Sequence, residues 1–219
     1  ILPFAVTAGF IVLASLPLFA VVNSVNPENS AEHPQLWRIF RIVPYVMLLN
    51  LTYAAAIESI LAFFPIYGIH IGIGEARSLS LLTILALGSV VWQFPLGWLA
   101  DHMSRHRLLL FCVLTTMIAV LLMPMFVSSP IGGPVYMFLF GGAEGMLYTL
   151  GMILLGQRFR GAELAATSVL FTGFWGAGTM IGPFVVGVGL DLLGNDALPY
   201  LLFMLYAAYL PFLVFRRRN

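Results

Sequence analysis

Two glutamates stand alone in long apolar stretches of this 219-residue chain, and they are its clearest candidates for chemistry. Glu58 lies within NLTYAAAIESILAFF, and Glu144 lies within FLFGGAEGMLYTLG. Burial in an apolar environment disfavours a charged carboxylate, so each acid favours its protonated form when its surroundings are dry. An acid that releases its proton toward one side of a barrier and regains it from the other could couple proton movement to a second process. It would also attract a cationic ligand.

Polar and aromatic residues share helical faces with both acids. Asn50 lies two turns before Glu58, and Tyr148 lies one turn after Glu144. Two other interpretations remain open: each glutamate could be a protonated, hydrogen-bonded structural group, or it could pair with a basic residue outside this sequence. The predicted proton or substrate site comprises Glu58, Glu144, Tyr148 and Asn50, with Gln93, Thr172 and Trp175 as weaker candidates.

The stretch GWLADHMSRHR at positions 97–107 is the third candidate, because it interrupts apolar sequence on both sides. One interpretation is a solvated loop whose arginines only orient the chain in a membrane. The other is a brace in which Asp101 pairs with an arginine or faces the N-terminus of another helix, since its own helix C-terminus favours cations. His102 and His106 have a spacing of four, but no further ligand accompanies them, so no metal site is predicted.

The elements that must position these residues are membrane-spanning helices. The chain is 61% hydrophobic and only 9% charged, and its mean hydropathy of +1.00 is typical of a membrane protein. The apolar runs are continuous rather than alternating, which favours helices over the strands of a barrel. About 20 apolar residues suffice to cross a bilayer. Seven stretches qualify: 2–22, 42–66, 78–99, 108–127, 134–156, 164–190 and 197–215.

The arginines predict the orientation of these spans. Nine of the ten basic residues follow the first, third, fifth and seventh spans, and only Arg77 lies on the opposite side. The positive-inside rule therefore predicts that the nine arginines and the C-terminus are cytoplasmic. The first span then begins outside, so we expect an upstream portion with an odd number of spans. The nine are Arg38, Arg41, Arg105, Arg107, Arg158, Arg160 and Arg216–Arg218.

Two motifs resemble those of the major facilitator superfamily. Residues 97–107 are similar to its loop signature G-x-x-x-D-R-x-G-R-R/K-R/K, with His102 and Ser104 in place of the usual arginine and glycine. The signature occurs between the second and third helices of each six-helix half. Residues 173–194, GFWGAGTMIGPFVVGVGLDLLG, resemble the glycine run in the fifth helix of a half. Residues 58–98 are similar to the start of the second half in small bacterial facilitators that are predicted exporters.

The resemblance implies an all-α polytopic membrane protein with the major facilitator fold. Residues 1–22 are then the last helix of the first half, 23–41 a cytoplasmic inter-domain linker, and 42–219 the C-terminal six-helix domain. The remainder of the N-terminal half would lie outside this sequence, and the expected location is a bacterial inner membrane. The resemblance also implies a cytoplasmic gate motif formed by Gly97, Asp101, Arg105 and Arg107.

The glycine run has a physical interpretation of its own. Gly178 and Gly182 are spaced by four, which leaves a groove where another helix backbone can approach closely. Pro183 removes a backbone donor and favours a kink. The carbonyl that loses its donor would have to accept a hydrogen bond from a neighbouring helix or from water. The run therefore predicts helix packing, and a transport hinge in addition, at Gly178, Gly182, Pro183 and Gly187.

The expected function is secondary active transport by alternating access, as proton-coupled export of a small organic compound that is lipophilic or cationic. The alternative is proton-linked import of a nutrient such as a sugar or an organic acid. The expected partners are this substrate, protons and the lipid bilayer. A retinal receptor would need a lysine, and the chain has none. No nucleophile–base cluster or H-E-x-x-H motif occurs, and the basic residues are too few for nucleic acid, so neither an enzyme nor a cofactor site is expected.

Overall fold

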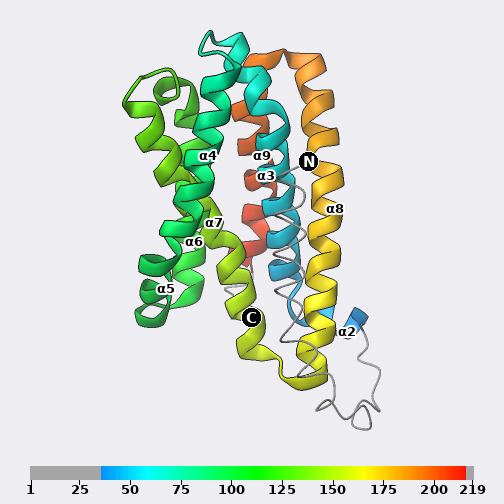
Figure 1. Cartoon of the computed structure of the whole chain (residues 1–219). Helices are drawn as coiled ribbons and strands as arrows, with labels where there is room; N and C mark the ends of the chain where they lie inside the picture. Colours follow the sequence, from blue (N-terminus) through cyan, green and yellow to red (C-terminus); the bar gives the residue numbers. More distant parts are fainter. Residues whose placement is uncertain (1–35, 216–219) are drawn as a thin grey trace, which may run out of the picture. The chain divides into compact units, whose positions relative to one another are not determined.

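The computed structural model describes residues 36–215, and within them it contains six helical segments long and apolar enough to cross a membrane (Figure 1). These segments confirm six of the seven predicted spans, each to within a few residues. The span at 2–22 lies outside the described residues, as do Arg216–Arg218. The described elements are α2 (Leu36–Ile42), α3 (Pro44–His70), α4 (Glu75–Val91), α5 (Gln93–His102), α6 (Arg105–Phe126), α7 (Gly132–Arg158), α8 (Gly161–Leu193), the 3₁₀ helix η3 (Asn195–Ala197) and α9 (Leu198–Phe215).

The second of these segments is interrupted where the sequence predicts one helix over 78–99. It spans Glu75–His102 but divides at Trp92 into α4 and α5. Pro95 explains the break, because proline has no N–H to donate to the carbonyl of Val91 and its ring crowds that carbonyl. Pro183 has no such effect, since α8 continues through it from Gly161 to Leu193.

Close approach of backbones at glycines organises the packing. The most extensive helix contacts join α3 to α8 and α4 to α7. A Cβ atom at Gly182 would overlap the backbone of Ala55 in α3, and one at Gly141 would overlap the backbone of Leu85 in α4. Small residues at such points let helices associate through direct backbone contact, which matters in lipid because lipid supplies no hydrophobic driving force between helices.

The described helices alternate in direction, so their arginines separate into two ends (Figure 1). Arg77, near the start of α4, lies at the end where α3 meets α4 and donates a hydrogen bond to the Ser129 carbonyl, 2.6 Å away. The other described arginines lie at the opposite end, at α2 and at the α5–α6 and α7–α8 junctions. They are Arg38, Arg41, Arg105, Arg107, Arg158 and Arg160.

The end of the predicted linker is helical in the structure, as α2. The sequence places residues 23–41 between two halves, but Leu36–Ile42 is helical and belongs to the same compact unit as the other described residues. Its Ile39 is buried in the core of that unit. The last turns of this segment therefore pack onto the six-helix unit. The division of the chain at residues 22 and 41 stays a prediction.

Candidate functional site

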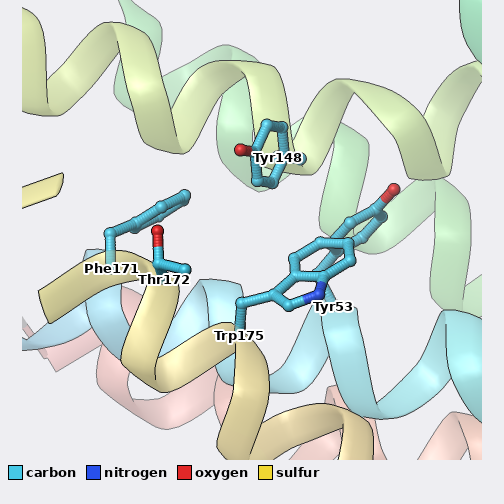
Figure 2. A pocket seen from close by; sticks show the side chains of 5 residues that line it. All are labelled: Tyr53, Tyr148, Phe171, Thr172 and Trp175. Carbon is cyan, nitrogen blue, oxygen red and sulfur yellow. The ribbon is translucent and has the colours of Figure 1, made fainter. Parts of the chain in front are cut away.

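A cavity of about 300 Å³ opens between α3, α7 and α8 (Figure 2). Tyr148 lies ten residues before Arg158, the end of α7, which is about 15 Å along the helix at about 1.5 Å per residue. The cavity is therefore well inside the membrane-spanning region. Its lining residues are Tyr53 of α3, Tyr148 of α7, and Phe171, Thr172 and Trp175 of α8.

Aromatic rings in mutual contact form most of this lining. The Trp175 ring lies 5.4 Å from the rings of both Tyr53 and Tyr148, and it meets Tyr148 edge-on at 82°. Tyr148 also contacts Phe171 at 5.5 Å. Edge-to-face contacts of this kind stabilise an aromatic cluster. A ligand in the cavity would therefore meet aromatic rings from all three helices.

Only some of the five lining residues are accessible to a ligand. Tyr53 and Phe171 are buried, whereas the Tyr148 residue is 38% exposed and Thr172 is exposed. Thr172 donates its hydroxyl proton to the Ser168 carbonyl, 3.0 Å away, and so presents an acceptor oxygen. Such a surface suits an apolar or cationic organic ligand, because ring faces attract cations and none of the five lining residues is basic.

Three of these five residues are candidates from the sequence, and two are not. Tyr148, Thr172 and Trp175 were predicted as site residues, and the structure brings them together. Tyr53 and Phe171 are the residues that sequence reasoning missed. Both lie in apolar runs where an aromatic side chain is ordinary, so only the packing of α3 against α8 distinguishes them.

Glu144 lies outside this cavity, in the interior of the bundle. Its residue is 1% exposed, and the Tyr206 hydroxyl of α9 donates to its Oε1 across 3.4 Å. That distance is long for such a bond, and no ion pair involves Glu144 within residues 36–215. A buried acid held by a single neutral donor is costly to ionise. Tyr148, one turn further along α7, lines the cavity, whereas Glu144 does not.

Asn50 has a structural position that the sequence did not indicate. It is buried, and its Nδ2 donates to the Phe171 carbonyl at 2.6 Å, so it joins α3 to α8 beside the cavity. Its Oδ1 has no partner in the described part of the chain. Gln93 is exposed at the start of α5 and does not line the cavity.

Glu58 has a different environment from Glu144. It is half-buried on α3, five residues after Tyr53, and makes no hydrogen bond or ion pair with residues of the described range. Of the four predicted site residues, the structure thus places Tyr148 in the cavity, Asn50 and Glu144 in the buried interior around it, and Glu58 on a more open face of α3.

The charged motif spans the end of α5 and the start of α6. A Cβ atom at Gly97 would meet nothing within 4 Å, so no close helix contact occurs there within residues 36–215. Asp101 is exposed and forms no ion pair in that range, and the buried Nε of Arg105 has no hydrogen-bond acceptor. Arg107 is exposed. Asp101 and Arg107 are therefore available to a partner beyond the described residues.

Replacing Asp101 with asparagine is expected to slow turnover of the full-length protein without weakening substrate binding. The side chain lies at the arginine-rich end and far from the aromatic cavity, so a bracing role would alter the rate of conformational change. Transport kinetics in proteoliposomes would show a lower kcat with little change in KM. Asp191→Asn, at an exposed carboxylate of α8, is the matched control. An affinity loss of about tenfold or more would instead make the loop part of the binding site.

The predicted packing and hinge residues lie along the α3 face of α8. A Cβ atom at Gly178 would overlap the Leu51 carbonyl, and one at Gly187 would lie 3.1 Å from the Phe63 ring. With the Gly182 contact described above, these positions form a seam against α3. Pro183 is half-buried within the continuous helix. The hinge role stays a prediction.

Comparison with known proteins shows where the chain belongs. A family model described as Major Facilitator Superfamily matches residues 1–133 and 71–219. The chain is 28% identical over 193 residues to the uncharacterized MFS-type transporter YfkF of Bacillus subtilis (strain 168), covering 85% of this chain and 49% of that relative. It is 23% identical over 179 residues to the uncharacterized MFS-type transporter Ent638_1421 of Enterobacter sp. (strain 638), covering 80% and 45%. The chain therefore spans about half the length of both relatives. No solved structure matches it.

The two matched ranges together extend over the whole chain, so they include the six membrane-competent helices, the aromatic cavity and the charged turn. The all-helical architecture of residues 36–215 agrees with one six-helix half of that fold. The protein is therefore an integral membrane protein, and its chain belongs to the major facilitator superfamily.

Proposed function

We propose that the full-length protein is a secondary transporter that exports a small lipophilic or cationic organic compound in exchange for protons. The observation that carries this proposal is the half-open aromatic cavity between α3, α7 and α8. Its lining offers ring faces and hydroxyl groups and no cationic side chain. A carboxylate or phosphate substrate would therefore find no counter-charge among these lining residues, whereas an organic cation would be attracted by the rings.

The two membrane-embedded acids support proton coupling. Glu144 lies twelve residues after Gly132 and fourteen before Arg158, so it is about 18 Å and 21 Å from the two ends of α7. Substrate and coupling-ion sites of transporters concentrate near this depth. Glu144 shares α7 with Tyr148, and Glu58 shares α3 with Tyr53. A change in solvent access at either helix would therefore reach both an acid and the cavity wall.

A proton-flux screen is the experiment that tests this proposal. The full-length protein would be reconstituted into proteoliposomes with an imposed pH gradient, and candidate compounds would be added on either side. We expect lipophilic cations to dissipate the gradient only when protein is present. Proton movement in the same direction as the compound would identify an importer. Accumulation of a compound without any proton movement would refute coupling.

Replacing Trp175 with alanine is expected to weaken substrate binding. The indole belongs to the accessible wall of the cavity, and loss of one ring face costs about 0.5–2 kcal/mol of interaction with a cation, or about 2-fold to 30-fold in affinity. Substrate titration in the proton-flux assay would show a raised KM with a smaller change in kcat. The matched control is Trp98→Ala, which removes an indole that is 64% exposed on α5. An unchanged KM for Trp175→Ala would show that the substrate does not bind in this cavity.

A further inference from the structure

A second hollow lies at the arginine-rich end of the molecule, between α2 and α8. It has a volume of about 230 Å³. All of its lining residues are apolar, and the Trp37 residue is 64% exposed. The lining residues, here called the α2 groove, are Leu36, Trp37 and Phe40 of α2 with Leu170 and Phe174 of α8.

A row of stacked rings fixes one wall of this groove. Trp37 stacks on Phe40 at 5.6 Å and 22°, and Phe40 stacks on Phe174 at 5.5 Å and 14°. Ile39, the residue before Phe40 in α2, is buried in the core. The short helix is therefore held by the ring contact with α8 and by the burial of Ile39, so the groove is a preformed feature of the surface.

Two arginines of α2 accompany this apolar surface, Arg41 beside Trp37 and Arg38 one turn before Arg41. Arg38 and Arg41 are both exposed, and neither forms a hydrogen bond or ion pair with residues 36–215. The Arg41 guanidinium lies over the Trp37 ring, 5.2 Å from its centroid. This contact orients the guanidinium beside the groove and leaves its N–H donors free, and the planar donor set of arginine suits phosphate oxygens.

The surrounding membrane contains amphiphiles that match this combination. The groove lies at the end that carries six of the seven described arginines, which the positive-inside rule assigns to the cytoplasm. The cytoplasmic leaflet is rich in anionic lipids, and each basic residue near its surface adds attraction to them. An acyl chain is complementary to the apolar lining, and an anionic headgroup is complementary to the pair of arginines.

We propose that the α2 groove, together with Arg38 and Arg41, binds an anionic glycerophospholipid of the cytoplasmic leaflet. The acyl chain lies against Trp37, Phe40 and Phe174, and the phosphate accepts hydrogen bonds from the two guanidinium groups. The binding itself does not depend on the proposed transport function, so each can fail without the other.

The groove and the aromatic cavity share a segment of α8, so lipid binding in the groove can affect the cavity. Leu170 and Phe174 face the groove, whereas Phe171, Thr172 and Trp175 line the aromatic cavity on the same two turns of α8. A lipid in the groove therefore restricts the segment of α8 that forms one wall of the cavity. A change of headgroup should alter the rate of transport as well as lipid binding.

Quenching of Trp37 fluorescence by lipids with brominated acyl chains tests the proposal directly. The full-length protein would be reconstituted with brominated phosphatidylglycerol or brominated phosphatidylcholine, and the Trp37 signal taken as the difference from the Trp37→Phe variant. At about fivefold per arginine, phosphatidylglycerol should be preferred by about 25-fold at low salt. Arg38→Gln with Arg41→Gln should abolish this preference. Arg158→Gln with Arg160→Gln, at the same end but outside the groove, is the matched control and should preserve it.

Three results would overturn the proposal. Equal quenching by both lipids would mean that the groove takes acyl chains without selecting a headgroup. Absence of Trp37 quenching by either lipid would mean that protein, such as the residues before Leu36 or a second subunit, covers the groove. Because the arginine side chains are exposed, the double variants should fold normally, and a folded double variant that keeps the preference would also refute the arginine contact.

Discussion

Replacing Glu144 with glutamine is expected to abolish proton-coupled transport by the full-length protein while leaving its expression intact. Glutamine has the same shape and keeps an oxygen that accepts the hydrogen bond of Tyr206, but it cannot release a proton. The bundle therefore stays packed while the exchangeable proton is lost. Proton flux and substrate flux would be measured in parallel in proteoliposomes, and substrate exchange without a gradient should persist.

Two further variants show whether the loss comes from the proton or from the structure. Tyr206→Phe removes only the phenol hydroxyl from the Glu144 contact, so it should cost about 1 kcal/mol of stability and leave coupling in place. Glu58→Gln tests the second acid, which lies on α3 without a hydrogen-bonded partner in the described range. Normal coupling of Glu144→Gln at every pH would make Glu144 a structural group. Loss of coupling only in Glu58→Gln would show that Glu58 of α3, and not Glu144, carries the exchangeable proton.

Replacing Gly182 with alanine is expected to lower the stability of the membrane domain by about 1–3 kcal/mol. A Cβ atom at this position would overlap the backbone of Ala55. Backbone atoms cannot move aside by rotating a side chain, so α3 and α8 would have to separate along their most extensive contact. Thermal unfolding of the purified full-length protein would measure the loss.

Gly176→Ala is the matched control for this prediction. It lies on the same helix, and a Cβ atom there would meet nothing within 4 Å in the described part of the chain. Both substitutions gain helix propensity, about 1 kcal/mol in each case, so their difference reports packing alone. Equal stability of the two variants would show that α3 and α8 are not held in this close contact.

Much of the fold could be predicted from the sequence because a bilayer restricts the chain so strongly. Each span needs a run of apolar residues of a certain length, and backbone groups in lipid must be satisfied within a helix. The six spans predicted between 42 and 215 accordingly agree with the structure. The division of the second segment at Trp92 was not predicted, because the effect of Pro95 depends on its position within the helix. Pro183, which the sequence treats in the same way, leaves α8 continuous.

The candidate site was less predictable, because periodicity describes one helix at a time. Tyr148 and Glu144 share a predicted helical face, yet Tyr148 lines the cavity and Glu144 contacts Tyr206 of α9. Asn50, predicted as a ligand-binding residue, donates instead to the Phe171 carbonyl. Each difference arises from the rotation of one helix against its neighbours, which side-chain volumes and close glycine contacts determine.

The sequence by itself determined the class of the protein, six of its spans and the separation of the described arginines between two ends, since hydropathy and charge act on each segment independently of the others. The tertiary structure decided which aromatic residues meet. Tyr53, Tyr148 and Trp175 come from three helices, and 27 residues separate even the closest two in sequence. Their contact exists because Gly178 and Gly182 bring α8 onto α3. The spacing of these glycines predicts a close approach, but no pattern within a single helix names the helix that approaches.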